Sequence, residues 1–159
     1  MRKLLLCAVL VFVAAASGVA IAAESASDPV VGTWKLNAAK STFTSGPALK
    51  SQMRTYSQSG SKITLVMKST GADGKEVTTR TSYQLDGKDY PVTDNPDFDS
   101  LAAHQVDSNT AEFTLKMGGK KVGTSSRMVS KDGKMLTSKM SLTNAIGEKS
   151  DSVLVFDKQ

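Results

Sequence analysis

The sequence of 159 residues contains very few of the side chains on which most metal and nucleophile chemistry depends. It has one cysteine, Cys7, and one histidine, His104. Cys7 lies in an apolar segment near the amino terminus. Because it is the only cysteine, the rest of the chain has no thiol for a disulfide, a nucleophile or a metal ligand. Zinc normally needs several His, Cys or carboxylate ligands, and one histidine does not supply them. We therefore expect no metal site, no cofactor and a domain held together by its core.

Charge of one sign is not concentrated anywhere in the chain either. Twenty basic residues stand against 15 acidic ones, which gives a net charge of +5. The basic residues alternate with Ser and Thr, as on the solvated face of a sheet, instead of forming the clustered basic patch that nucleic-acid binding requires. We expect no nucleic-acid partner, and the pattern indicates no particular oligomeric state.

Residues 1–23 have the pattern of a secretory signal peptide. Arg2 and Lys3 precede an unbroken apolar run over residues 4–13, and small residues follow up to Ala22 and Ala23. A retained membrane anchor is the alternative, but such a span needs about 20 apolar residues. We predict cleavage near Ala22 or Ala23, no membrane span after cleavage, and a periplasmic or secreted location.

The remaining residues have the size of one ordinary domain. Residues 24–29 are small and polar, and they are predicted to be a flexible tail before a barrel domain over residues 30–159. From residue 50 onward apolar side chains alternate with polar ones, which predicts strands with one apolar face each. The clearest examples are residues 63–67, 77–85, 111–117 and 136–142.

Turn signals recur between these segments. Asp-Gly pairs at residues 73–74, 86–87 and 132–133, Gly118-Gly119, and Ser108-Asn109 are typical of tight hairpin turns. Connections this short join antiparallel neighbours. The predicted fold is therefore all-β: an up-and-down antiparallel meander of eight to ten strands closed into a lipocalin-like barrel, with no long helix in the mature chain. A two-sheet sandwich is the main alternative, because periodicity does not separate the two.

The segment Gly32-Thr33-Trp34-Lys35-Leu36 contains the only tryptophan, and Trp34 and Leu36 lie on one face of an extended strand. It resembles the opening strand of the calycins, which include the lipocalins and the fatty-acid-binding proteins, and the chain is similar to small exported bacterial lipocalin-like proteins. The resemblance implies a barrel that carries a small apolar molecule. Two features depart from the fatty-acid-binding proteins: Gly46-Pro47 interrupts the region of their lid helices, and residues 153–158 lack the Arg-x-Tyr pair of their closing strand.

The expected function is that of an exported small-molecule binding protein, which holds a lipid-like apolar or amphipathic ligand in the barrel interior. Core packing competes with ligand binding as the role of each interior side chain. The alternative function is a filled barrel without a ligand that acts through its surface in the cell envelope. The candidate ligand-binding residues are Trp34, Met53, Leu65, Met67, Tyr83, Phe113, Arg127 and Met140.

Three arginines in the predicted strands, Arg54, Arg80 and Arg127, are further candidates, because an inward-pointing arginine needs an anion. An outward position is the simpler interpretation for each of them. Arg127 is kept among the candidate ligand residues because neither face of its strand is plainly apolar. Which face of that strand looks inward stays open.

No catalytic constellation is visible, and we expect that the protein is not an enzyme. His104 has Asp99 and Asp107 as sequence neighbours, but no serine stands in a Gly-x-Ser-x-Gly elbow. Residues 93–100 carry three aspartates within six residues, and a calcium loop requires oxygen ligands at alternate positions, yet the segment lacks the central Gly and the late Glu of an EF-hand. A structured surface loop is the preferred interpretation of this segment, whereas a lip at the barrel mouth is the alternative for Tyr90, Pro91 and Phe98.

Overall fold

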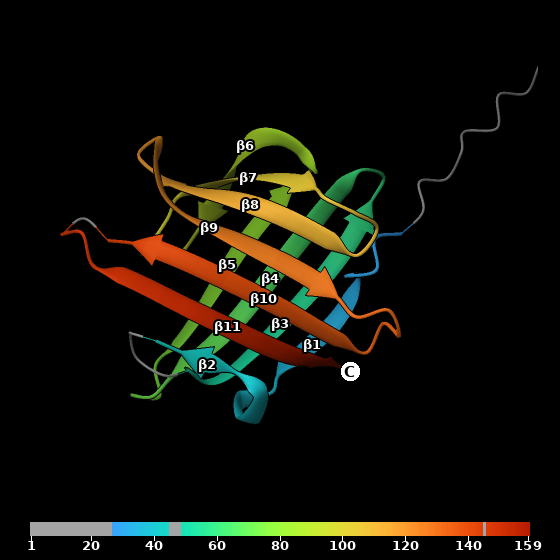
Figure 1. Cartoon of the computed structure of the whole chain (residues 1–159), viewed down its shortest axis with the longest axis horizontal. Helices are drawn as coiled ribbons and strands as arrows, with labels where there is room; N and C mark the ends of the chain where they lie inside the picture. Colours follow the sequence, from blue (N-terminus) through green and yellow to red (C-terminus); the bar gives the residue numbers. More distant parts are fainter. Residues whose placement is uncertain (1–26, 45–48, 145) are drawn as a thin grey trace, which may run out of the picture.

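A computed structural model describes residues 27–44, 49–144 and 146–159, so the predicted signal peptide lies outside the described residues. The chain forms one sheet of 11 antiparallel strands (Figure 1). The strands are β1 (Gly32–Leu36), β2 (Thr42–Phe43), β3 (Leu49–Ser59), β4 (Lys62–Gly71), β5 (Glu76–Tyr83), β6 (Asp86–Thr93), β7 (Ser100–Gln105), β8 (Thr110–Met117), β9 (Lys120–Val129), β10 (Met135–Thr143) and β11 (Lys149–Lys158). A short 3₁₀ helix, η1 (Ala38–Lys40), is the only helical element in the described part of the chain.

The sheet closes on itself, which confirms the barrel and excludes the two-sheet sandwich. Strands β3 to β11 pair in chain order, and β1 pairs with both β3 and β11. At the closure Trp34 is opposite Lys158, and Leu36 is opposite Phe156. The barrel therefore has ten strands and no free edge along this seam. The short strand β2 lies outside the ring and adds to β11, where Phe43 is opposite Ser152.

The alternation of side chains accounts for most strands as predicted. In β8 the inward residues Ala111 and Leu115 are buried while Glu112 is exposed, and in β10 Leu136 is buried while Lys139 is exposed. The turns at residues 72–75, 118–119 and 130–134 also lie where the glycines indicated. One turn prediction is wrong: Asp86-Gly87 lies in the bulged start of β6, and the connection from β5 is residues 84–85.

Gly32, the first residue of the Gly-x-Trp segment, has a backbone reason to be glycine. Its φ angle is +132°, which residues with a side chain rarely adopt. A Cβ atom at this position would lie 3.0 Å from Cε of Lys158 in the neighbouring strand. The glycine therefore allows β1 to enter the ring beside the last strand.

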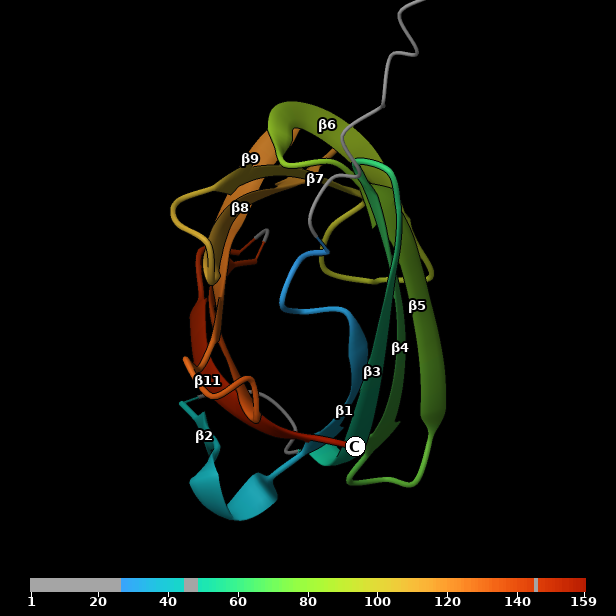
Figure 2. The same ribbon diagram turned by 90° about the vertical axis from the view of Figure 1, so that its right-hand side faces the viewer.

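The barrel has two different ends. The Asp28 end is the end at which β1 begins, and it carries the connections at residues 60–61, 84–85, 106–109 and 130–134. The opposite end, called the far end, carries the connections at residues 72–75, 94–99 and 118–119. Figure 2 looks along the barrel and shows the segment before β1 running inside the ring. Within the predicted flexible tail, Asp28 is held in the barrel by hydrogen bonds with Val30, Gln58 and Arg127.

The core lies inside the ring. Its largest fully buried side chains include Trp34, Tyr83, Phe156, Ile63 and Leu136.

In the described part of the chain, no helix has the length and apolar character needed to cross a membrane.

Candidate functional site

Trp34 closes the interior near the Asp28 end. Its indole is completely buried, and its Nε1 donates a hydrogen bond of 2.7 Å to the carbonyl of Val30. Lys158 lies over the same ring, with Nζ 5.1 Å from the ring centroid. Because Val30 is also fully buried, the segment before β1 and the indole form one packed plug.

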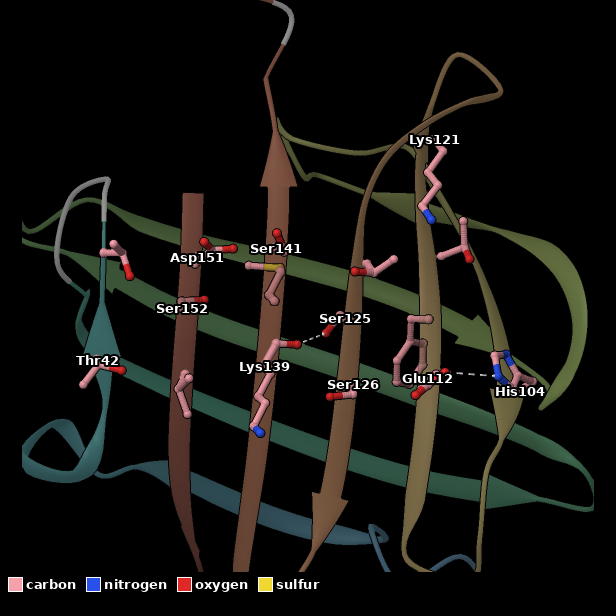
Figure 3. A pocket seen from close by; sticks show the side chains of 16 residues that line it. Thr42, His104, Glu112, Lys121, Ser125, Ser126, Lys139, Ser141, Asp151 and Ser152 are labelled. Carbon is pink, nitrogen blue, oxygen red and sulfur yellow. Dashed lines mark hydrogen bonds and ion pairs between the residues drawn. The ribbon is translucent and has the colours of Figure 1, made fainter. Parts of the chain in front are cut away.

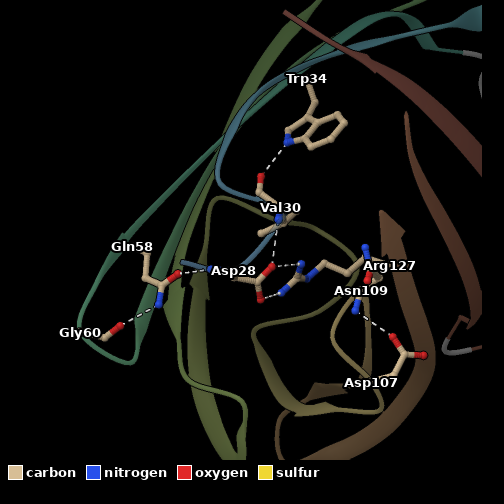
Figure 4. Close-up of polar contacts among 8 residues, drawn as sticks. All are labelled: Asp28, Val30, Trp34, Gln58, Gly60, Asp107, Asn109 and Arg127. Carbon is tan, nitrogen blue, oxygen red and sulfur yellow. Dashed lines mark hydrogen bonds and ion pairs between the residues drawn. The ribbon is translucent and has the colours of Figure 1, made fainter. Parts of the chain in front are cut away.

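Asp28 completes this plug through a charge pair (Figure 4). Its two carboxylate oxygens accept hydrogen bonds of 2.9 and 2.6 Å from Nη1 and Nη2 of Arg127, which points inward from β9. Asp28 also accepts from the amide of Val30 at 2.9 Å, and its own amide donates to Gln58 at 2.7 Å. The two side chains of the pair are 10% and 4% exposed, so both charges are buried and directly compensated.

The pair shifts the pKa values of both partners. Burial alone would raise the pKa of Asp28, but the hydrogen bonds and charge of Arg127 outweigh it, and the pKa lies below the ordinary value of 3.8. Burial alone would lower the pKa of Arg127, and the contacts with Asp28 raise it instead. The pair is therefore ionised at neutral pH, and Arg127 has its anion within the chain.

Two polar atoms beside this pair are sealed from solvent. The hydroxyl of Tyr83 and Nε of Arg127 are buried and have no hydrogen-bond partner among the described residues. Burial raises the pKa of Tyr83, so the phenol stays neutral. Phe113 covers it edge-on, with the ring centroids 5.5 Å apart. These side chains pack closely around the pair, and a pocket of about 460 Å³ lies at the same end, lined in part by Asp28, Gln58 and Ile63.

The half of the interior toward the far end is less closed. Leu65, Met67, Phe113 and Met140 face inward, yet each is only half-buried. Their inward direction follows from the register, because Met67 is opposite the buried Arg54 and Phe113 is opposite the buried Ala103. Their partial burial contrasts with the nearly complete burial of Trp34 and Tyr83 in the other half.

Arg54 lies between the two halves. It points inward from β3, is 8% exposed, and stacks over the ring of Phe156 with Cζ 4.3 Å from the centroid. Its Nε donates to Oε1 of Gln52 at 2.9 Å, and Nε2 of Gln52 donates to Ser69 at 2.7 Å. None of the ion pairs in the described part of the chain includes Arg54.

The structure brings together seven of the eight candidate residues on the inner face. Trp34, Tyr83 and Arg127 lie in the plug half, whereas Leu65, Met67, Phe113 and Met140 lie toward the far end. Met53 is misplaced: it is 37% exposed on the outer face, because Gln52, Arg54 and Tyr56 are the inward residues of β3.

The outward interpretation is wrong for Arg54 and Arg127, and only Arg80 is exposed as interpreted. Sequence reasoning also missed Asp28, which looked like part of a loose tail. One signal for β3 was present: Tyr56 shares its face with Arg54 and Gln52, whereas Met53 shares its face with the polar Ser51, Thr55 and Ser57. The aromatic residue was the better indicator of the inner face.

A groove of about 540 Å³ lies on the outer face of β7 to β11 (Figure 3). Its side chains are mostly hydroxyls and charges, including Glu112, Lys139 and Asp151. His104 lies at its edge, with Nε2 3.4 Å from Oε2 of Glu112, and both side chains are more than half exposed. Both side chains are thus solvated, whereas the groups used in general acid–base catalysis are commonly tuned by burial and by neighbouring groups.

The aspartate-rich loop is tied to the barrel by its own side chains. Oδ1 of Asn95 accepts from the amides of Asp97 at 2.9 Å and Phe98 at 3.3 Å, and Asp99 accepts from the amide of Gly118 at 2.8 Å. Phe98 and Tyr90 pack against the core. This is the structured surface loop preferred above, and within the described residues no three His, Cys, Asp or Glu side chains are grouped to hold a metal ion.

No protein-family model matches the sequence, and no curated protein matches it. Solved structures do resemble the fold. Rv2717c from M. tuberculosis has a TM-score of 0.53 and 14% identity, over 82% of this chain and 93% of that one. The protein EF1p2_mFAP2b bound to DFHBI has a TM-score of 0.51 and 10% identity, over 82% and 94% of the two chains. With its closed antiparallel ring and up-and-down order, the chain has a calycin-like fold.

Proposed function

We propose that the protein is an exported binding protein that holds a small apolar or amphipathic molecule in the far half of its barrel. The observation that carries this proposal is the unequal burial of the interior. Trp34 and the Asp28–Arg127 pair are buried near the Asp28 end, whereas Leu65, Met67, Phe113 and Met140 face inward and are only partly buried. An apolar surface inside a barrel that solvent can reach is what a small-molecule site requires.

The chemistry of these side chains supports the same function. Met67 and Met140 have flexible thioethers that adapt to apolar ligands of different shapes. EF1p2_mFAP2b, whose fold this chain resembles, is bound to DFHBI. The pattern of residues 1–23 supports export, and a chain whose only cysteine is Cys7 does not depend on the redox state of its compartment.

The test combines detection of a ligand with blocking of the site. Native mass spectrometry of gently purified protein is expected to show a copurified small molecule. Met140→Trp fills the far half of the interior and is expected to weaken the binding of an uncharged apolar dye at least tenfold. Met128→Trp is the matched control, because Met128 lies on the outer face of β9 and is 49% exposed. Equal dye binding by both variants would contradict the proposal.

A surface role without a ligand is the second candidate, and the outer groove over β7 to β11 is the observation that favours it. The groove offers charges of both signs, such as Lys139 and Asp151, to a partner. If no small molecule copurifies and Met140→Trp has no effect on dye binding, this second function is the better one.

A further inference from the structure

The pocket at the Asp28 end is separate from the half of the barrel to which an apolar ligand is assigned above. It has a volume of about 460 Å³, and its walls come from the β3–β4, β5–β6 and β7–β8 hairpins and from residues 27–29. It shares no lining residue with the outer groove over β7 to β11. A molecule bound in this pocket would therefore occupy a second site.

The pocket is lined by amide groups that the chain uses only in part. Each of the three hairpins contributes one glutamine, and these are Gln58, Gln84 and Gln105. Oε1 of Gln58 accepts from the amide of Asp28 at 2.7 Å, and its Nε2 donates to the carbonyl of Gly60 at 2.8 Å (Figure 4). Oε1 of Gln84 accepts from Oγ of Ser61 at 2.6 Å, whereas its Nε2 makes no hydrogen bond with a described residue. Gln58 thus shapes the wall, and an amide donor of Gln84 is left for a ligand.

Gln105 adds a second amide for a ligand. It is exposed at the end of β7, and its side chain has no hydrogen-bond partner among the described residues. An unpaired primary amide offers two donors and one acceptor oxygen. Together with Gln84 it presents both kinds of hydrogen-bonding group, as the recognition of hydroxyl groups requires.

The rest of the lining limits the class of ligand. Eight of the 11 lining residues are polar, which does not suit a long apolar chain. Ile63, at 2% exposed, and the half-buried Pro29 and Leu85 form the apolar part. No Lys, Arg or His is among the described residues that line the pocket, so an anion would have no positive partner there.

The two carboxylates of the pocket already have cations beside them. Asp28 is paired with Arg127. Asp86 accepts hydrogen bonds from the amide of Lys88 at 3.1 Å and the hydroxyl of Tyr90 at 3.0 Å, and Nζ of Lys88 is 3.5 Å away. The Lys88 amide and the Tyr90 hydroxyl lower the pKa of Asp86, so it is ionised at neutral pH. Its oxygens still have lone pairs for ligand hydroxyls, whereas a cationic ligand would gain little from charges that are already compensated.

We propose that this pocket binds a small neutral polyhydroxylated molecule of the size of a monosaccharide. Hydroxyls on the rim of the ring would bond with the amides of Gln84 and Gln105, and the apolar C–H face of the ring would lie against Ile63. Because residues 27–29 form part of the wall, the bound molecule would also contact the segment before β1. This site is independent of the binding function proposed for the far half.

The experiment titrates the protein with three probes that share one pyranose ring: neutral D-glucose, anionic D-glucuronate and cationic D-glucosamine. Amide NMR spectra of isotope-labelled protein locate the binding. Glucose is expected to cause saturable shifts at millimolar concentration, confined to the amides of residues 27–29, 58–63, 84–86 and 105–108. Glucuronate is expected to bind about tenfold more weakly or not at all, and glucosamine within about threefold of glucose, because the pocket has no cation and no uncompensated anion.

Two variants test the amides. Gln84→Leu and Gln105→Leu keep the size of the side chain, and each is expected to weaken glucose binding about twofold to tenfold, as the loss of one hydrogen bond implies. Thr124→Val is the matched control, because it makes the same exchange of a polar for an apolar side chain in the outer groove. It is expected to bind glucose like wild type.

The wild-type titration alone can overturn the proposal. Absence of a saturable shift with glucose, or shifts centred on the outer groove near Lys139 and Asp151, would show that the pocket is not a sugar site. Binding of glucuronate or glucosamine more than about tenfold tighter than glucose would overturn the neutral class. Unchanged glucose binding by both leucine variants would overturn the role of the amides. None of these results affects the far half, which Met140→Trp tests separately.

Discussion

The carboxylate of Asp28 and the guanidinium of Arg127 are joined by two parallel hydrogen bonds, although the residues are 99 positions apart in the chain. The contact attaches the segment before the first strand to the ninth strand, across the interior. Both side chains are at least nine-tenths buried, so water compensates neither charge when its partner is removed.

The first prediction concerns this pair. Asp28→Asn leaves the Arg127 guanidinium buried without its anion and is expected to lower the free energy of unfolding by about 3–5 kcal/mol, measured by urea unfolding. Asp89→Asn is the control, since it breaks an exposed ion pair with Lys116 at 2.7 Å. Its expected loss is about 1 kcal/mol or less.

A double variant tests whether the loss comes from the unpaired charge. Asp28→Asn combined with Arg127→Met removes both charges and is expected to recover a large part of the lost stability, because an apolar residue of similar length replaces the stranded cation. A double variant that is no more stable than Asp28→Asn alone would show that the tie between the segment and β9 matters more than the compensation of charge.

The second prediction concerns acid. The pKa of Asp28 is lowered in the folded protein, so its contribution is fully present above the ordinary value of 3.8 and is lost as the pH falls through the lower folded value. The difference in free energy of unfolding between wild type and Asp28→Asn is therefore expected to shrink below about pH 4. Urea titrations from neutral to acid pH measure it. A difference that stays constant over this range would contradict the assignment, because Asp99 and Asp107, whose pKa values are also lowered, are common to both proteins.

The third prediction concerns the indole at the plug. Trp34→Ala is expected to lower the free energy of unfolding by about 3–5 kcal/mol, because it empties a fully buried site. Trp34→Phe keeps most of the volume but loses the hydrogen bond to Val30, and it is expected to lie between wild type and the alanine variant. Urea unfolding followed by circular dichroism measures all three proteins without depending on the tryptophan. A Trp34→Ala curve that matches wild type would place the indole outside the core.

The fourth prediction concerns a hydroxyl. The Tyr83 hydroxyl is buried without a hydrogen-bond partner among the described residues. Tyr83→Phe removes an unsatisfied polar group and is expected to leave the free energy of unfolding within about 1 kcal/mol of wild type or to raise it. A larger loss in urea unfolding would mean that the hydroxyl has a partner, for example a bound water shared with Nε of Arg127.

The sequence predicted the architecture because the signals for it are local. Alternation in β8 and β10 and the glycines at residues 74, 118, 119 and 133 each act within one strand or one turn, and their sum leaves few alternatives to an antiparallel meander. The Asp86-Gly87 signal misled because the same backbone conformation also serves a bulge inside a strand: Gly87 has a φ angle of +76° in β6.

The candidate site was harder to predict from the sequence, because it depends on contacts between distant parts of the chain. In β3 both faces carry polar residues, so a period of two residues divides the strand without saying which half looks inward. Nothing near Asp28 in the sequence indicates that its partner lies in β9. The burial of Arg54 and Arg127 depends on their neighbours in the folded barrel, which the sequence does not identify. Because the inward face of β3 was also not identified, Met53 was wrongly placed inside.

The pairing of the first and last barrel strands also affects which orders of the strands along the chain could form the same barrel. Gln159 donates its amide to the carbonyl of Thr33 at 2.9 Å, which holds the last residue beside the beginning of the first barrel strand. A circular order of strands therefore has no structural beginning at β1. A permuted gene that joins the carboxyl end to residue 27 through a short linker, and opens the chain at the exposed Asp132-Gly133 turn, would encode the same ring in a different order of synthesis.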